Sequence, residues 1–403
     1  MASLPIPTLP VPTAQALAHS AALTSHIQQK IIGNKGWTDF ASFMQMALYT
    51  PHLGYYSGGA QKFGIGGDFV TAPEISPLFA KTLARQVCQV LIETQGGGAQ
   101  SDVLELGAGT GKLAVDLLLE LGQLNQLPTH YYILEVSDYL RQVQRENLQK
   151  RLSADLFDRV IWLDTLPTEF VGIMIGNEVL DAIPVHLLYR QHDTWFERGV
   201  TFNDGLVNNG HVNNGFVWQD QPLQSLALQQ YVQAWAVPND YLTEVCPAAI
   251  GLINSLSACL QRGVILMLDY GFGAAEYYHP QRNQGTLMCH YQHYAHSDPL
   301  INVGLQDVTA HVNFSAIADA GVAQGLSLLG YCNQAHFLIN AGLLDIMQQV
   351  SPHDIAAYAP LAAAAQKLLS PAEMGELFKV IAFGKGIQSD LIGFVQGDKR
   401  HTL

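Results

Sequence analysis

A glycine-rich turn carries the clearest chemical signal in this chain. The segment Val103-Leu104-Glu105-Leu106-Gly107-Ala108-Gly109-Thr110-Gly111 has an apolar strand pattern that ends in an acidic residue and alternating glycines. Glycine lets a backbone approach a ligand closely and adopt angles that a Cβ atom forbids. A dinucleotide fingerprint would need glycine where Lys112 stands, and a phosphate-binding P-loop would need glycine at Leu106 and Ser or Thr at Leu113. The G-x-G-x-G form is typical of the first motif of methyltransferases, and the alternative is a tight strand–helix turn without a ligand.

Acidic residues also follow other predicted strands. Glu135 ends the strand predicted over 131–136, where a carboxylate can bind ribose hydroxyls. Asp164 follows the strand predicted over 160–163 and would either face an adenine amine or lie exposed in a loop. Asp269 and Tyr270 end a further strand, where the acid would either shape a substrate pocket or accept hydrogen bonds from loop amides.

The most unusual constellation is Asn177-Glu178-Val179-Leu180-Asp181-Ala182-Ile183-Pro184. It follows the fourth predicted strand, at the sheet edge where open α/β folds bind ligands. Glu178 and Asp181 are three residues apart, so on a helical turn they would share one face and could hold a guanidinium in fork geometry. The alternative is that they are acids favoured at a helix N-terminus.

Other polar residues give weaker signals. His290, Asp307 and His311 lie in apolar surroundings and are either substrate-binding groups or structural residues. The five cysteines are scattered without C-x-x-C spacing, and no H-E-x-x-H pattern occurs among the fifteen histidines. These patterns predict reduced thiols and no metal site.

The elements that must position these residues alternate between strands and helices. This rhythm predicts an α/β, Rossmann-like fold with a mostly parallel sheet. Seven strands are predicted, over 102–106, 131–136, 160–163, 172–175 and 264–269, after Leu326 and around Val380. Helices are predicted from Ala14 to Ile32, from Thr38 to Leu48 with Thr38 as the cap, from Pro77 to Glu93 with Ser76 as the cap, from Leu113 to Leu121, and after Ser137.

Four segments are expected along the chain: an N-terminal helical extension over 1–98, the first part of the Rossmann-like core over 99–190, an inserted subdomain over 191–250, and the second part of the core over 251–403. The alternation of strands and helices is interrupted between His186 and Pro247, where Asn209-Gly210 and Asn214-Gly215 predict hairpin turns.

Bulk composition limits the class of protein. A formal net charge of −14 without a basic run argues against a nucleic-acid partner. No apolar run approaches the roughly 20 residues of a membrane span. The first twenty residues contain no Lys or Arg, so we expect neither a secretory signal nor a mitochondrial presequence. The cytoplasm is the expected location, in preference to the mitochondrial matrix.

Several segments in the same order resemble the MidA-like methyltransferases, which include the mitochondrial protein-arginine methyltransferase that assists assembly of respiratory complex I. The matching runs, over about residues 30–386, are 67–76, 105–111, 177–184, 269–271, 285–287, 306–314 and 334–338. Two positions depart from the family pattern: Ala80 stands where glycine is common, and Asn313 where Asp is frequent.

The resemblance implies a class I methyltransferase fold with an N-terminal helical extension and a substrate-covering insert. S-adenosyl-L-methionine is the implied cofactor, and the segment Gly67 to Glu74 is expected to fold over it. The implied reaction is arginine methylation on a partner protein such as a complex I subunit, with symmetric dimethylation in the mitochondrial branch. The oligomeric state stays open, a homodimer included.

We therefore predict three sets of site residues. The catalytic set is Asn177, Glu178 and Asp181. The cofactor-binding set is Thr71, Pro73, Glu74, Glu105, Gly107, Ala108, Gly109, Glu135, Asp164 and Asn177. The substrate-binding set is Asp269, Tyr270, His290, Asp307 and His311. The alternatives are an NAD-dependent oxidoreductase, which Lys112 disfavours, and an assembly factor that holds the cofactor without turnover.

Overall fold

The computed structural model describes residues 9–58, 71–96, 100–203, 215–233 and 235–403. The chain divides into two compact units. Unit 1 comprises Met1–Phe69, Asp181–Ala249 and Ala275–His311; unit 2 comprises Val70–Leu180, Ile250–Ala274 and Val312–Leu403. Each unit is thus built from three separate stretches of sequence, and the expected N-terminal extension over 1–98 contributes to both.

Unit 2 contains a sheet of eight strands in the order β15-β16-β10-β5-β2-β3-β4, with β14 paired to β10. Strands β4, β3, β2, β5 and β10 are parallel, and β16 runs antiparallel to both β10 and β15. The strands are β2 Asp102–Leu106, β3 Tyr131–Leu134, β4 Val160–Leu163, β5 Phe170–Asn177, β10 Leu260–Phe272, β14 Val312–Asn313, β15 Ser327–Asn333 and β16 Phe378–Lys385. The predicted α/β fold with a mostly parallel sheet is confirmed. The predicted count of seven strands is one short, because the two-residue β14 carries no pattern of its own.

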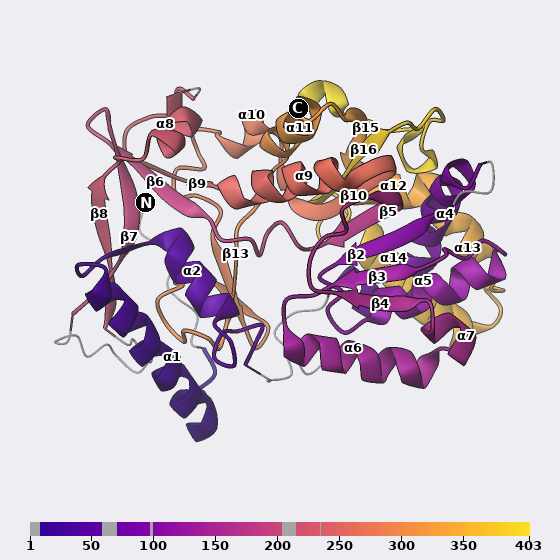
Figure 1. The fold of residues 1–403 in the computed structure, drawn as a ribbon, viewed down its shortest axis with the longest axis horizontal. Coiled ribbons are helices and arrows are strands. Elements are labelled where there is room, and N and C mark those ends of the chain that lie inside the picture. Colours follow the sequence, from indigo (N-terminus) through magenta and orange to yellow (C-terminus); the bar gives the residue numbers. More distant parts are fainter. Residues whose placement is uncertain (1–8, 59–70, 97–99, 204–214, 234) are drawn as a thin grey trace. The chain divides into compact units, whose positions relative to one another are not determined.

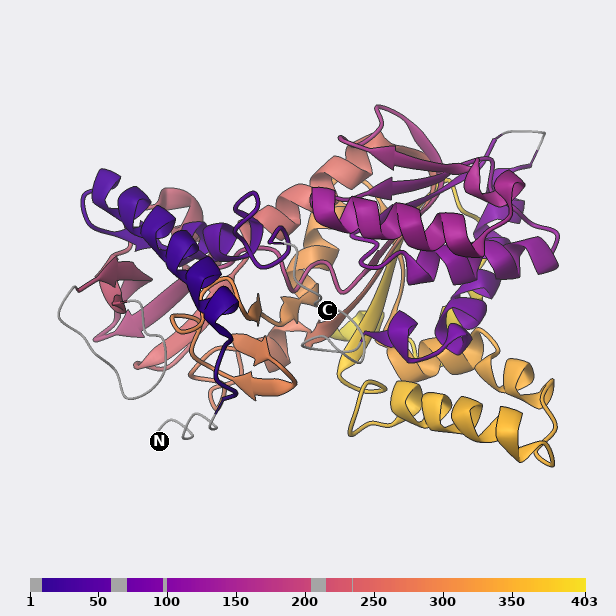
Figure 2. The same ribbon diagram turned by 90° about the horizontal axis from the view of Figure 1, so that it is seen from below.

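Both faces of this sheet are buried, as a parallel sheet requires. Val264, Leu266 and Leu268 belong to a core shared with helices α4 and α5, whereas Phe383 of β16 packs against Gly321 of α11 and lies outside that core. The helices are α3 Ala72–Ile75, α4 Pro77–Thr94, α5 Lys112–Gln123, α6 Asp138–Arg151, α7 Ala154–Phe157, α11 Phe314–Ala323, α12 Gln334–Asn340, α13 Leu343–Gln348, α14 Ile355–Leu369, η1 Ile392–Phe394 and η2 Arg400–Thr402. Figure 1 shows β2, β3 and β4 beside α5, and Figure 2 shows the orange to yellow helices of residues 334–369 gathered together.

Unit 1 combines a helical N-terminal segment with two small antiparallel sheets. One sheet has the order β1-β7-β6-β9 with β8 paired to β7, and the other has the order β12-β11-β13. The core joins Leu23 and Ile27 of α1, Phe43 of α2, Val200 of β7 and Val308 of β13. The elements are α1 Ala14–Gly33, β1 Thr38–Asp39, α2 Phe40–Tyr49, β6 His186–Gln191, β7 Thr194–Phe202, β8 Phe216–Pro222, α8 Leu226–Gln233, β9 Tyr241–Val245, β11 Met288–Tyr291, β12 Tyr294–His296 and β13 Asp307–Thr309. Helices α9 Pro247–Cys259 and α10 Ala274–Tyr277 each include residues of both units.

Side-chain caps explain where several helices begin. Ser76 and Ser137 accept hydrogen bonds from the first turns of α4 and α6, as predicted. The predicted cap of α2 was wrong: Asp39 accepts from the backbone nitrogen of Ser42, and Thr38 belongs to β1. Because β7 and β8 pair antiparallel, they form the expected hairpin, although the predicted turn at Asn209-Gly210 and the residue Asn214 lie outside the described residues. None of the helices that the structure describes combines the length and the apolar character needed to cross a membrane.

Candidate functional site

The glycine-rich turn links β2 to α5 in unit 2. Gly107, Gly109 and Gly111 all have positive φ, at 59°, 53° and 79°, a region that residues with a Cβ atom adopt at a cost. A Cβ atom at Gly111 would lie 2.5 Å from the side chain of Leu148, whereas one at Gly109 would meet no atom within 4 Å. A side chain at Gly111 is therefore disfavoured by the backbone conformation, and it would also require the buried side chain of Leu148 to shift. At Gly109 there is open space beside the backbone, and the close approach of a ligand there stays a prediction from the sequence.

Glu135 lies directly after β3 and is 5% exposed. Its carboxylate accepts hydrogen bonds from the backbone nitrogen of Ser137 (2.9 Å) and from Nε2 of Gln144 (3.0 Å). Burial raises the pKa of Glu135, and these donors partly offset the rise. Gln144 of α6 also donates to the carbonyl oxygen of Gly109 and accepts from the indole of Trp162, both at 3.0 Å. One buried amide thus connects the glycine-rich turn, the carboxylate after β3 and strand β4.

Glu105 lies in β2 beside the same turn and is 3% exposed. The hydroxyl of Tyr131 donates to its Oε2 atom at 2.7 Å. Burial raises the pKa of Glu105 to about 7; the Tyr131 hydrogen bond opposes this rise and the charge of Glu135 adds to it. Unit 2 therefore places a second buried carboxyl group next to the glycine-rich turn, in a position where its charge depends on pH.

Asp164 follows β4 and differs from the other acids because its side chain is 88% exposed. Nη1 of Arg141 lies 2.7 Å from its Oδ1 atom. The same guanidinium donates to the carbonyl oxygens of Glu135 and Leu163. Arg141 thereby holds the ends of β3 and β4 together, and Asp164 lies at that junction.

The short helix α3 lies beside the glycine-rich turn. Thr71 precedes it, and Ala72 and Pro73 are buried. The carboxylate of Glu74 accepts a hydrogen bond from the hydroxyl of Thr110, and the backbone nitrogen of Ala72 lies 3.4 Å from Oε1 of Glu178. Helix α3 thus contacts both the turn after β2 and the loop after β5. Gly67 to Val70, the rest of the segment expected over the cofactor, lie outside the described residues.

The loop after β5 departs from the expected helical turn. Residues 178–184 form no helix, and Glu178 has a φ of 53°. Its Oε1 atom accepts from Nδ2 of Asn177 at 3.0 Å. Oδ1 of Asn177 is buried and has no hydrogen-bond partner among the described residues. The shared helical face predicted for Glu178 and Asp181 was therefore wrong, since a left-handed residue starts the loop.

Asp269 of β10 determines the path of this loop. Its side chain is fully buried, and its Oδ2 atom accepts from the backbone nitrogens of Val179 (3.1 Å) and Leu180 (2.9 Å). The backbone nitrogen of Glu178 in turn donates to the carbonyl oxygen of Leu268. Asp269 therefore accepts hydrogen bonds from loop amides, which is one of the two roles that the sequence allowed for it. Tyr270 lies next to it, with its ring packed edge-on against Phe378.

The other predicted site residues belong to unit 1. Asp307 is 2% exposed and accepts from the hydroxyl of Tyr56 (2.8 Å). The backbone nitrogen of His311 donates to the hydroxyl of Thr286 (3.0 Å). Burial, and then the charge of His296, lowers the pKa of His290. Asp181 is 5% exposed and its carbonyl oxygen accepts from Ala310.

Sequence reasoning missed Gln144 and two tyrosines. Tyr49 and Tyr56 stack at 5.4 Å between ring centroids, and burial, followed by the charge of Asp307, raises the pKa of Tyr56 well above its usual range. Gln144 gave no signal because polar helix residues are usually exposed. For the stacked pair Tyr49 and Tyr56, the sequence offered one signal: two adjacent tyrosines, Tyr55 and Tyr56, in a glycine-rich stretch.

Comparison with known proteins identifies the family. Residues 82–332, more than half of the chain, match the family described as "Putative S-adenosyl-L-methionine-dependent methyltransferase". The zebrafish (Danio rerio) protein named protein arginine methyltransferase NDUFAF7, mitochondrial, is 30% identical over 384 residues, which cover 89% of this chain and 86% of the relative. The human protein of the same name is 27% identical, covering 89% of this chain and 82% of the relative.

Solved structures agree with the sequence comparison. A crystal structure of a "likely methyl transferase" from Burkholderia thailandensis bound to S-adenosyl-homocysteine has a TM-score of 0.92 and 48% identity, covering 98% of this chain and all of the other. The zebrafish and human relatives carry mitochondrial names, so the expectation of a cytoplasmic protein is overturned. The absence of Lys and Arg from the first twenty residues was too weak a basis for it.

Proposed function

From the premise that this chain belongs to the S-adenosyl-L-methionine-dependent methyltransferase family, we propose that it methylates an arginine side chain of a partner protein. Its cofactor is S-adenosyl-L-methionine. The arginine assignment is supported by the names of the relatives, which are protein arginine methyltransferases. Through the same resemblance we propose a subunit of respiratory complex I as the partner.

The cofactor would be held by the residues around the glycine-rich turn. We assign Gly107, Ala108 and Gly109 to the backbone that faces the cofactor; Gly107 is exposed, Gly109 is half-buried and Ala108 is buried. Glu135 supplies a carboxylate whose direction Gln144 and Ser137 fix. We further assign Glu105, Asp164 and the α3 segment Thr71, Pro73 and Glu74 to this site. The open backbone at Gly109 fits a ligand pressed against the main chain. S-adenosyl-L-methionine supplies an electrophilic methyl group on a sulfonium.

The single observation that carries the catalytic proposal is the fixed carboxylate of Glu178. It lies at the carboxyl end of β5 and is oriented by Asn177 and Ala72. A guanidinium has only N–H donors and stays protonated at neutral pH, so it needs a carboxylate that orients one nitrogen and favours loss of its proton during transfer. Glu178 is suited to this role, with the buried oxygen of Asn177 as a second acceptor. The roles of Asp181, Asp269, Tyr270, His290, Asp307 and His311 in holding the substrate stay sequence-based proposals.

Glu178→Gln tests this assignment, because it keeps the shape of the side chain and removes its charge. Labelled methyl donor would be incubated with the protein and a host lysate, and the labelled residue identified by mass spectrometry. We expect label on arginine with the wild-type protein and none with Glu178→Gln. Affinity for S-adenosylhomocysteine should change less than about tenfold, or about 1.4 kcal/mol. Glu169→Gln changes an exposed glutamate just before the same strand and serves as the matched control.

The outcomes separate the competing ideas. Label on another residue type would exclude arginine as the target. Undiminished transfer by Glu178→Gln would exclude the carboxylate role while leaving the enzyme class untouched. Tight binding of S-adenosylhomocysteine without any labelled protein would favour an assembly factor that holds the cofactor without turnover.

A further inference from the structure

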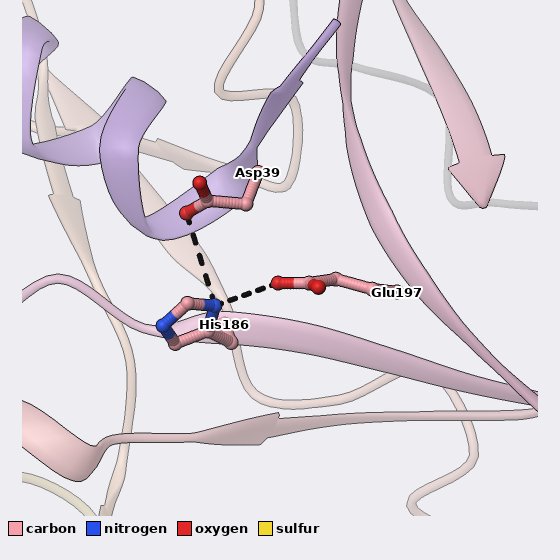
Figure 3. A group of neighbouring side chains, drawn as sticks. All are labelled: Asp39, His186 and Glu197. Carbon is pink, nitrogen blue, oxygen red and sulfur yellow. Dashed lines mark hydrogen bonds and ion pairs between the residues drawn. The ribbon is translucent and has the colours of Figure 1, made fainter. Parts of the chain in front are cut away.

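Three potential metal ligands meet on one face of the five-stranded sheet of unit 1. Figure 3 shows the side chains of Asp39, His186 and Glu197 pointing toward one another. Leu188 pairs with Glu197, and Asp39 pairs with Gly199. Because side chains alternate between the faces of a sheet, His186, two residues before Leu188, shares a face with Glu197, and so does Asp39. The three residues lie on three separate strands, β1, β6 and β7, so no local sequence motif indicated that they would meet.

The donor atoms lie at distances that one metal ion could bridge. Nδ1 of His186 lies 2.7 Å from Oε1 of Glu197 and 3.8 Å from Oδ1 of Asp39. All three donor atoms lie within 4.8 Å of one another. Metal–ligand bonds of about 2.0–2.2 Å with tetrahedral angles place neighbouring donors roughly 3.3–3.6 Å apart. Of the two separations from Nδ1 of His186, 2.7 Å is shorter and 3.8 Å is longer than this range. Small side-chain rotations would therefore bring the atoms into position.

Hydrogen bonds satisfy part of this cluster, because the carboxylate of Asp39 accepts from the backbone nitrogen and the hydroxyl of Ser42, both at 2.8 Å. A proton on Nδ1 of His186 can serve Glu197 at 2.7 Å, but 3.8 Å to Asp39 is too long for a hydrogen bond. Among the described residues, no lysine or arginine forms an ion pair with either carboxylate. Two carboxylates beside one imidazole therefore carry excess negative charge, which a cation would neutralise more fully than a single proton.

We propose that Asp39, His186 and Glu197 form a binding site for a divalent transition-metal ion of the zinc class. One imidazole nitrogen and two carboxylate oxygens suit such ions. Their side chains are 24%, 26% and 14% exposed, so an ion can enter and water can complete its coordination. The ion would link β1, at the edge of the sheet, to β6 and β7, and thereby fasten the N-terminal helical segment to the inserted strands within unit 1.

The test measures binding of Zn²⁺ alone to the full, tag-free protein after treatment with chelator. Calorimetry should give one site that is lost in His186→Ala and weakened at least tenfold in Asp39→Asn. Asp39→Asn is informative because asparagine caps a helix as well as aspartate does, so α2 should be retained. Co²⁺ in place of Zn²⁺ would report nitrogen and oxygen coordination through its visible absorption.

His130→Ala is the matched control, because Nδ1 of His130 lies 3.3 Å from a single carboxylate, that of Asp102. This variant should bind Zn²⁺ as the wild-type protein does. The proposal is overturned if the wild-type protein binds no Zn²⁺, or if His186→Ala and Asp39→Asn bind it as tightly as the wild-type protein and His130→Ala do. Far-UV circular dichroism of each variant separates loss of a ligand from loss of folding.

Discussion

The Oδ2 atom of Asp269 lies 2.9 Å from the backbone nitrogen of Leu180. A fully buried carboxylate on β10 thus holds the loop that follows β5, the neighbouring strand. The loop begins with Glu178 in the left-handed region, which costs a residue with a side chain roughly 1–2 kcal/mol. Such a conformation persists only where its surroundings fix it. Asp269 provides that restraint, and its position in the sheet makes it a positioning residue for Glu178.

Asp269→Asn should therefore impair both stability and transfer. The substitution replaces a charged acceptor of two amide hydrogens with a neutral amide, and we expect the free energy of unfolding to fall by about 1–3 kcal/mol. Displacement of Glu178 by about 1 Å should slow methyl transfer by about a hundredfold, while affinity for S-adenosylhomocysteine changes less than about tenfold. Urea denaturation, transfer assays and calorimetry measure the three quantities.

Asp345→Asn is the control for this prediction, because the side chain of Asp345 is 68% exposed and its ion pair with Arg85 lies at the surface. It should change the free energy of unfolding by no more than about 0.5 kcal/mol. Equal effects of the two substitutions would contradict the positioning role of Asp269.

Gly109→Ala should weaken cofactor binding. Gly109 and Gly325 both have positive φ, and a Cβ atom at either would meet no atom within 4 Å. Alanine should therefore destabilise the protein by roughly 1–2 kcal/mol at both positions. Only at Gly109 would the added methyl group enter the space assigned to the cofactor. Calorimetry should show at least a tenfold loss of S-adenosylhomocysteine affinity for Gly109→Ala and none for Gly325→Ala; equal affinities would exclude close approach of the ligand at Gly109.

Local patterns predicted much of unit 2 correctly. Apolar runs defined its seven longer strands, and serine caps defined the starts of α4 and α6. The positive φ of Gly109 also agrees with the requirement for glycine inferred from the motif. These features depend on neighbouring residues in the chain, so the sequence carries them directly.

Contacts between residues that are far apart in the sequence were not predicted, because local patterns do not show which distant segments meet. Asp269 holds amides 89 and 90 residues away, and Gln144 bonds to the backbone of a residue 35 positions away. Asp39 and Glu197 approach each other only once β1 and β7 pair. The spacing of Glu178 and Asp181 is typical of one face of a helix, but the backbone nitrogens of the segment donate hydrogen bonds to Asp269 and hold it as a loop.

The raised pKa of Glu105 predicts a pH-dependent stability. Burial raises the pKa of this carboxyl group from 4.5 to about 7, so the folded protein binds a proton more tightly than the unfolded chain does. The stabilisation from that proton is fully present below pH 4.5 and is lost as pH rises through about 7. At about 1.4 kcal/mol per pKa unit the loss amounts to roughly 3 kcal/mol.

Glu105→Gln removes this titration while its amide oxygen can still accept from Tyr131. Relative to the wild-type protein, the variant should therefore become more stable as pH rises, by roughly 3 kcal/mol between about pH 4.5 and 8. Urea denaturation at constant ionic strength across this range measures the difference. The exposed control Glu169→Gln should keep a difference from wild type within about 0.5 kcal/mol. A difference for Glu105→Gln that stayed constant with pH would mean that Glu105 does not take up its proton in this range, and that donors close to it stabilise the ionised form.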